Sequence, residues 1–167
     1  ALARGATPLA EIVGYGVSND GTHPLRPNPH GQALAISRAL KDADLKPEQV
    51  EYINAHATGT MTGDRIETEA IKTVFGDHAH RLAVSSIKGH MGHLIGACGA
   101  LEAISTVKSL QTKILPPTLH FAPGDELCDL DYVPNQARQL DKLDIAISNS
   151  FGMGGNNSVL VFKAYNE

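Results

Sequence analysis

Three short segments hold the side chains that could do chemistry. They are NAHATGT with His56, SIKGHMGH with Lys88 and His93, and the glycine-rich NSFGMGGNN near the end of the sequence. Imidazole and ammonium groups donate hydrogen bonds or exchange protons, and imidazole also binds metal ions. The backbone N–H groups of a glycine-rich turn can bind an anion. Proton transfer, metal binding and anion stabilisation are therefore the chemistries to weigh.

Each segment also allows a simpler interpretation. A lone histidine at a strand end is more often a hydrogen-bonded structural residue than a catalyst. His90 and His93 form an H-x-x-H pair, but no cysteine or acidic residue stands at a convincing ligand spacing, which disfavours a metal site. FGMGG joins two expected strands and lacks the helix and the Lys-Ser/Thr of a phosphate loop. His78 and His80 flank a turn, where we expect exposure and no role.

The hydrophobic pattern predicts the elements that carry these segments. Apolar runs indicate strands in residues 10–17, at the start of 50–60, and in 82–89, 143–150 and 157–164. Helical spacing and end signals indicate helices in residues 32–45, 63–76 and 93–112. The order β-α-β-α-β-α-β-β predicts an α/β fold with a mixed, mostly parallel five-stranded sheet, whose closing hairpin adds an antiparallel edge.

This topology would bring the three segments to one rim of the sheet. His56 follows the second expected strand, Lys88 and His93 follow the third, and the glycine segment follows the fourth. In open α/β sheets, sites collect beyond the carboxyl ends of the strands. We therefore expect one shared site.

Composition limits the partners and the compartment. The 167 residues suffice for one domain with its own core, and a net charge of −4 gives no electrostatic reason to expect nucleic acid or a membrane surface. No apolar run approaches the roughly 20 residues of a membrane span. Cys98 and Cys128 are too few for a disulfide scaffold, which favours a reducing, cytoplasmic compartment.

The expected third helix is poor in side-chain bulk. It contains Gly96, Ala97, Cys98, Gly99 and Ala100 in succession. Each glycine costs a helix about 1 kcal/mol relative to alanine. Because close packing of another backbone would offset that cost, we expect this helix to lie between layers, against an equivalent helix from a second half.

The segments resemble, in the right order, those of the elongating β-ketoacyl-acyl carrier protein synthases (types I and II) of the thiolase superfamily. The likeness is carried by YINAHATGTMTGD, VSSIKGHMGHLIGACGALEAI, LPPT, CDLDYVP and NSFGMGGNNSVLVF. It covers nearly the whole chain but matches only the C-terminal half of such an enzyme. It implies one thiolase-like domain over residues 1–167, half of a layered αβαβα fold. The other half, with the nucleophilic cysteine, is absent, and the chain without initiator Met reads as the middle of a protein.

The resemblance implies a decarboxylative Claisen condensation. Malonyl-carrier protein loses carbon dioxide, and neutral His56 and His93 each donate one N–H to the enolate oxygen before the carbanion attacks an acyl-cysteine thioester. Lys88 is implied to position the site electrostatically, with Glu102 as its partner or, equally, as a plain surface residue. His93 is expected to begin the third helix, where the dipole and desolvation disfavour imidazolium.

Further roles follow from the same resemblance. Thr58 and Thr60 match hydroxyls that contact the pantetheine arm, with hydrogen bonds to the turn backbone as the alternative or additional role. Asp64 and Glu67 are expected only to cap and solvate the second helix. For binding substrate, holding the oxyanion and gating the acyl chain, the implied residues are Phe151, Gly152, Met153, Gly154 and Gly155.

A second loop and three departures complete the comparison of motifs. The loop around Asp20 and His23 resembles a supporting mobile loop beside the glycine loop. Ala57 stands where glycine is usual, Met153 replaces a gating phenylalanine and loosens the gate, and Asn156 replaces threonine without a clear effect.

The resemblance also implies the partners. They are the Cys-bearing N-terminal half, acyl carrier protein, and a second ketosynthase unit in a homodimer or heterodimer. Phosphopantetheine arrives on the carrier protein, so no cofactor or metal is expected, and the chain by itself should not condense anything. One alternative is a non-catalytic partner like a chain-length factor, which retention of His56, Lys88 and His93 disfavours. Another is a modular polyketide synthase domain, against which CDLDYVP argues weakly.

Overall fold

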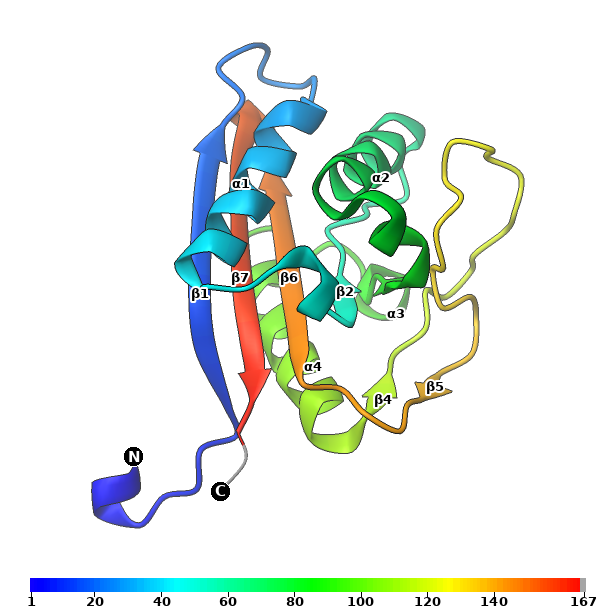
Figure 1. The fold of residues 1–167 in the computed structure, drawn as a ribbon. Coiled ribbons are helices and arrows are strands. Elements are labelled where there is room, and N and C mark those ends of the chain that lie inside the picture. Colours follow the sequence, from blue (N-terminus) through cyan, green and yellow to red (C-terminus); the bar gives the residue numbers. More distant parts are fainter. Residues whose placement is uncertain (166–167) are drawn as a thin grey trace.

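A mixed sheet of five strands forms the centre of the fold, which the computed structural model describes over residues 1–165 (Figure 1). In spatial order the strands are β1 (Ala10–Asn19), β7 (Asn156–Ala164), β6 (Ile145–Gly152), β2 (Tyr52–Asn54) and β3 (Ala83–Ser85). β7 runs antiparallel to β1 and β6, whereas β6, β2 and β3 pair in parallel. The predicted mixed sheet of five strands is confirmed, with two parallel and two antiparallel pairings among its strands.

The predicted antiparallel edge is wrong. The closing hairpin does end in antiparallel β7, but β1 pairs along the outer side of β7, so that β1 and β3 are the edges. An interior strand must bury both of its faces, and β7 does so with Val159 and Val161 on one side and Phe162 on the other. Strand order is a property of long-range pairing, which the order of elements along the chain does not contain.

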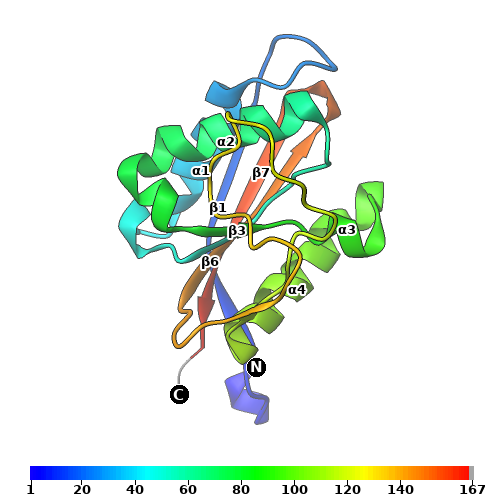
Figure 2. The ribbon, with the colours of Figure 1, turned by 90° about the vertical axis from the view of Figure 1, so that its right-hand side faces the viewer.

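Helices cover both faces of the sheet (Figures 1 and 2). α1 (Pro29–Asp42) and α2 (Met61–Phe75) lie on one face, and α4 (Cys98–Thr112) lies on the other. The first two were predicted to within three residues at each end. α1 begins early because Pro29 occupies its first turn and the Asn28 side chain accepts a hydrogen bond from the N–H of His30.

The third predicted helix is divided. Residues 88–97 contain one helical turn, α3 (Lys88–Met91), and a short 3-10 turn before α4 begins at Cys98. Gly92 has φ 76° and Ile95 has φ 52°, and neither value can continue a right-handed helix. The prediction that the helix starts at His93 is therefore wrong, because the apolar pattern continues through two backbone reversals that it does not reveal.

Two apolar cores result, one on each face of the sheet. In β2, Ile53 packs into the core under α1 and α2, whereas its neighbour Tyr52 packs into the core under α4. The same alternation places Ile147 of β6 on the first face and Ala146 on the second. The sheet is thus fixed from both sides, and so are the ends of its strands.

The glycines of β1 let α1 lie very close to the sheet. A Cβ at Gly16 would stand 2.1 Å from the carbonyl oxygen of Ala35, and one at Gly14 would stand 2.4 Å from that of Ala39. Only glycine fits at this distance, which explains the alternation of glycine with larger residues in GYG.

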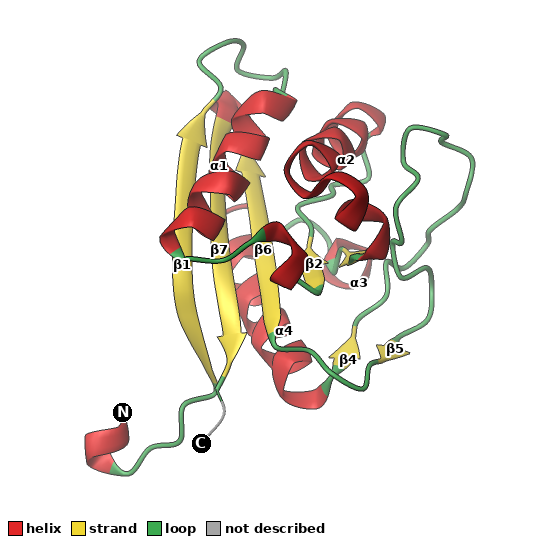
Figure 3. Cartoon of the chain, viewed as in Figure 1, coloured by secondary structure: helices red, strands yellow, loops and turns green. Residues whose placement is uncertain are grey.

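The remaining elements are short (Figure 3). β4 (Ile114–Leu115) and β5 (Arg138–Gln139) form a separate two-stranded sheet that the sequence did not predict. The 3-10 helices are η1 (Leu2–Arg4), η2 (Pro47–Gln49), η3 (Gly76–Arg81), η4 (Ile95–Ala97) and η5 (Met153–Gly155). Within the described residues, none of the helices has both the length and the apolar character needed to cross a bilayer.

Candidate functional site

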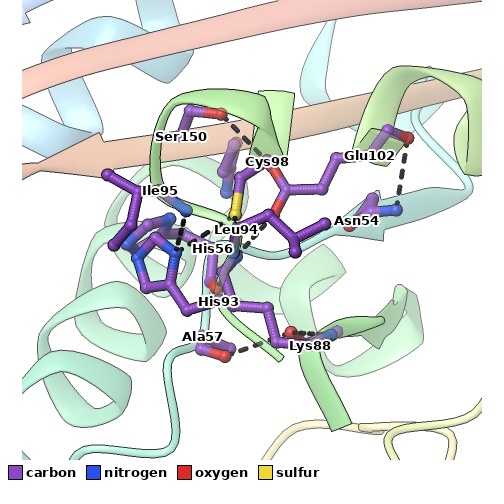
Figure 4. Close-up of polar contacts among 12 residues, drawn as sticks. Asn54, His56, Ala57, Lys88, His93, Leu94, Ile95, Cys98, Glu102 and Ser150 are labelled. Carbon is purple, nitrogen blue, oxygen red and sulfur yellow. Dashed lines mark hydrogen bonds and ion pairs between the residues drawn. The ribbon is translucent and has the colours of Figure 1, made fainter. Parts of the chain in front are cut away.

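The ends of β2, β3 and β6 bring the three chemical segments to one rim. His56 follows β2, Lys88 and His93 follow β3, and the glycine loop connects β6 to β7. The rings of His56 and His93 meet edge to face, with centroids 5.6 Å apart and planes at 82° (Figure 4). The ring of Phe151 is also close to that of His56, with 6.1 Å between the ring centroids. Two imidazoles thus face one small volume.

His56 is held by its backbone and kept neutral by its surroundings. Its N–H donates to Glu67 Oε1 (2.9 Å), the N–H of Ala57 donates to Glu67 Oε2 (2.8 Å), and its carbonyl accepts from Lys88 Nζ. Burial lowers the pKa of His56 from 6.5 to about 3, and the positive charge of Lys88 acts in the same direction. The ring is therefore an uncharged hydrogen-bonding group at neutral pH.

His93 is exposed in this chain and lies five residues before α4. The expectation that it begins an apolar helix is therefore wrong, and within this chain burial does not desolvate it. Its Nδ1 instead accepts the N–H of Ile95 (3.1 Å) and lies 3.1 Å from Cys98 Sγ. Because Nδ1 is an acceptor, the proton of the neutral ring is on Nε2. The positive φ of Ile95, unusual for a β-branched residue, turns that N–H toward the ring.

Lys88 and Glu102 form a buried ion pair behind the histidines. Lys88 Nζ contacts Glu102 Oε1, and the two side chains are 7% and 2% exposed. Ser150 Oγ donates to Glu102 Oε2 (3.3 Å), while the ammonium also reaches the His56 carbonyl (Figure 4). The reading of Glu102 as a surface residue is therefore wrong. The pair links α3, α4 and β6 to the backbone of His56.

Glu67 has a part in the site that the sequence did not predict. It was expected to solvate α2, yet it is 4% exposed and accepts hydrogen bonds from two backbone N–H groups and from Asn149 Nδ2 (3.1 Å). Burial raises its pKa, and these hydrogen bonds oppose the rise. Its position four residues before buried Ile71 places it on the inner face of α2, a signal available in the sequence.

An open cavity of about 1370 Å³ runs past the two histidines. Among the predicted residues it is lined by Asp20, His56, Thr58, Thr60, His93, Phe151, Gly152, Met153 and Gly155. The hydroxyls of Thr58 and Thr60 bond to one another (3.1 Å). Within residues 1–165 neither bonds to the backbone, and so the turn-stabilising alternative is not seen there.

The glycine loop lies against the loop of Asp20. The N–H of Asp20 donates to the carbonyl of Gly155 (2.9 Å), and Asn157 Nδ2 donates to Asp20 Oδ1 (2.7 Å). A Cβ at Gly155, where φ is 73°, would stand 2.7 Å from the Cβ of Asp20. The Gly154 N–H donates to the Pro24 carbonyl (2.8 Å), so that this amide is occupied in the present conformation.

Not every predicted residue reaches the cavity. His23 is exposed, its Nδ1 accepts the N–H of Leu25 (3.1 Å), and it is not among the cavity-lining residues. Met153 does line the cavity, but at the tip of the glycine loop it is 77% exposed. His90 Nε2 bonds to the Pro117 carbonyl (2.9 Å), and in the described part of the chain no three His, Cys, Asp or Glu side chains gather as a metal site requires.

Comparison with known proteins agrees with this arrangement. Residues 9–122 match the family model described as beta-ketoacyl synthase, C-terminal domain. A 3-oxoacyl-[acyl-carrier-protein] synthase 2 of Synechocystis sp. is 50% identical over 99% of this chain and 40% of its own length. Two similar solved structures also cover 99% of the chain. The ishigamide ketosynthase/chain length factor has a TM-score of 0.95 at 41% identity over 40% of that chain. A type II polyketide ketosynthase solved with its acyl-carrier protein has a TM-score of 0.96 at 34% sequence identity, and the match covers 41% of that chain.

These matches confirm the predicted thiolase-like α/β fold and the predicted family. The chain spans about two fifths of the length of the curated relatives it matches. It therefore belongs to the beta-ketoacyl synthase family, of which it represents the C-terminal domain.

Proposed function

We propose that this chain supplies the two histidines of a β-ketoacyl-acyl carrier protein synthase. In that reaction malonyl-carrier protein loses carbon dioxide and the resulting carbanion attacks an acyl thioester, which lengthens the acyl chain by two carbons. The observation that carries the proposal is the meeting of His56 and His93, 5.6 Å between ring centroids, beside an open cavity.

The geometry suits an enolate. Loss of carbon dioxide from a malonyl thioester leaves negative charge on the thioester oxygen, and fixed donors in a site shielded from water stabilise it most. His56 is neutral because its pKa is about 3, and His93 carries its proton on Nε2 because Nδ1 accepts a hydrogen bond. Each ring can therefore give one N–H to the same oxygen. Lys88 and Glu67 hold the His56 backbone and act as positioning residues.

We infer that the attacking thiol lies outside this chain, which spans about two fifths of the curated relatives' length. Burial raises the pKa of the Cys128 thiol, which disfavours the thiolate, and Cys98 Sγ already contacts His93 and the Leu94 N–H. The synthase thus combines this domain with a Cys-bearing N-terminal half. Its substrates arrive on acyl carrier protein, whose phosphopantetheine serves in place of a cofactor. Two such synthase units form a homodimer or heterodimer. Two free thiols support a reducing, cytoplasmic setting.

A variant of His93 tests the proposal. In the complete synthase, His93→Ala should abolish malonyl decarboxylation while the acyl group still transfers to the cysteine, followed by mass spectrometry of the acyl-enzyme. His90→Ala is the matched control, because His90 lies nearby but bonds to the Pro117 carbonyl. Loss of acyl transfer with decarboxylation intact would contradict the assignment.

A second candidate is a non-catalytic subunit that resembles a chain-length factor. Its support is the likeness to the ishigamide ketosynthase/chain length factor. Sequencing of the N-terminal half that accompanies this chain separates the two. A reactive cysteine there supports the enzyme, whereas glutamine or another unreactive residue at that place supports the partner subunit.

A further inference from the structure

Cys98 lies against the Nδ1 edge of the His93 ring, away from the Nε2–H that would face the substrate. It is the first residue of α4 and 7% exposed, and it lines the cavity. Its Sγ is 3.1 Å from His93 Nδ1, and it accepts the N–H of Leu94 (3.2 Å) (Figure 4). Both contacts are within the range of hydrogen bonds to sulfur, and neither is explained by packing of a small apolar side chain.

The direction of the contact with His93 follows from the other partners. Nδ1 of His93 already accepts the N–H of Ile95, and a hydrogen on Nδ1 would therefore clash with the hydrogen of that N–H. Nδ1 is thus unprotonated. Leu94 fills an acceptor position of the sulfur. The hydrogen between Sγ and Nδ1 is therefore that of the thiol, and Cys98 is the donor.

We infer that Cys98 is a positioning residue that fixes the orientation of the His93 imidazole. Ile95 N–H and Cys98 S–H both donate to Nδ1, from the chain before α4 and from α4 itself. An exposed imidazole held at one point can rotate about its side-chain bonds. Held by two donors on the same nitrogen, it keeps Nε2–H directed toward the volume that it shares with His56.

The effect on catalysis rests on the proposed function, whereas the contact itself does not. Loss of one neutral hydrogen bond corresponds to a rate effect of about fivefold, since such a bond is worth about 1 kcal/mol. Because Cys98 is inferred to act through the ring of His93, the loss should appear in kcat for malonyl decarboxylation and leave KM unchanged.

The test compares Cys98→Ala, Cys98→Ser and Cys128→Ala in the complete synthase. Serine keeps a donor, alanine does not, and Cys128→Ala removes the other thiol, which lies between Thr68 and Asp125 instead of at His93. With ¹⁵N-labelled histidine, the Nδ1 resonance of His93 should shift in Cys98→Ala and remain unchanged in Cys128→Ala. The decarboxylation kcat should fall about fivefold in Cys98→Ala and about twofold or less in Cys98→Ser.

The outcomes separate the two ideas. An Nδ1 resonance and a kcat that are both unchanged in Cys98→Ala overturn the inference. So does a serine variant that loses as much as the alanine variant, because the thiol would then act by packing. If the resonance responds but the parent synthase decarboxylates no malonyl thioester, the positioning contact stands and the proposed function fails. Should Cys98→Ala not fold, the resonance in Cys98→Ser still reports whether a donor faces Nδ1.

Discussion

Lys88 and Glu102 form an ion pair that is almost completely removed from solvent, and Lys88 also donates to the carbonyl of His56. The pair therefore joins the helix that follows His93 to the backbone of the other histidine. Buried pairs of this kind contribute little net stability but are costly to break, because the remaining partner keeps an uncompensated charge. Their value here is that they fix where His56 lies.

Breaking this pair from either side should destabilise the fold. Lys88→Met or Glu102→Gln should each lower the free energy of unfolding by about 3–5 kcal/mol, and the double variant should lose less than the sum of the two. Urea titration of the complete synthase measures this. The control is Lys142→Met, which breaks an exposed pair with Asp144 and should cost under about 1 kcal/mol. Additive losses would mean that the two charges do not depend on each other.

Glu67 should be required in its ionised, acceptor-only form. It receives three N–H groups on two oxygens, and Glu67→Gln would turn one donor-facing oxygen into a donor. We expect about 2 kcal/mol less stability and at least tenfold slower malonyl decarboxylation, because the loop of His56 loses its anchor. Exposed Glu69→Gln, two residues along the same helix, serves as the control. Equal activity of the two variants would remove Glu67 from the site.

His56 should not titrate in the physiological range. Its pKa in the folded protein is about 3, lowered from 6.5 chiefly by burial. Its ring Cε1–H resonance in the complete synthase should therefore be constant from pH 8 to about 5, whereas a peptide of residues 53–59 should titrate near pH 6.5. A midpoint of the folded resonance above pH 5 would be inconsistent with a permanently neutral ring.

The same shift makes a stability prediction with a definite sign. The unfolded chain takes up the His56 proton below pH about 6.5, and the folded chain does so only near pH 3. Protonation therefore favours the unfolded state in this window. The contribution of His56 is complete above pH 6.5 and is lost progressively as the pH falls toward 3. A His56→Gln variant should show a flatter decline in stability over that interval.

The outer face of α4 should be an internal surface of the complete synthase. Ala100 and Ile104 are exposed in this chain, and a Cβ at Gly96, in the 3-10 turn before α4, would meet nothing within 4 Å. Ala100→Leu should lower the stability of the complete synthase by about 1–3 kcal/mol through overpacking. Lys108→Leu, two turns further along the same face, should change it by less than about 0.5 kcal/mol. If Ala100→Leu left the stability of the complete synthase unchanged, this face of α4 would be exposed to solvent there.

The elements with strong apolar periodicity could be predicted from the sequence, and so could their order. His56, Lys88 and His93 could be brought to one rim because each follows a strand of a parallel group, a relation that topology determines. The interior position of β7 in the sheet could not be predicted, because pairing between distant strands leaves little trace in the local sequence pattern.

The electrostatic details were less accessible. The sequence led us to expect a neutral ring at His93, because we placed that residue at the start of a helix, but the helix begins at Cys98. The histidine whose pKa is lowered mainly by burial is His56. Glu67 was taken for a solvated helix residue because a carboxylate is usually exposed. Its three N–H donors become neighbours only once β2, β6 and α2 have packed together.

The most direct measurement is a structure of the complete synthase with a malonyl-pantetheine analogue that cannot lose carbon dioxide. Two neutral imidazoles are predicted to share one substrate oxygen. The thioester oxygen should therefore lie about 3 Å from a ring nitrogen of His56 and from Nε2 of His93. A thioester oxygen that contacts only one of the rings, or that is bound by solvent instead, would contradict the account.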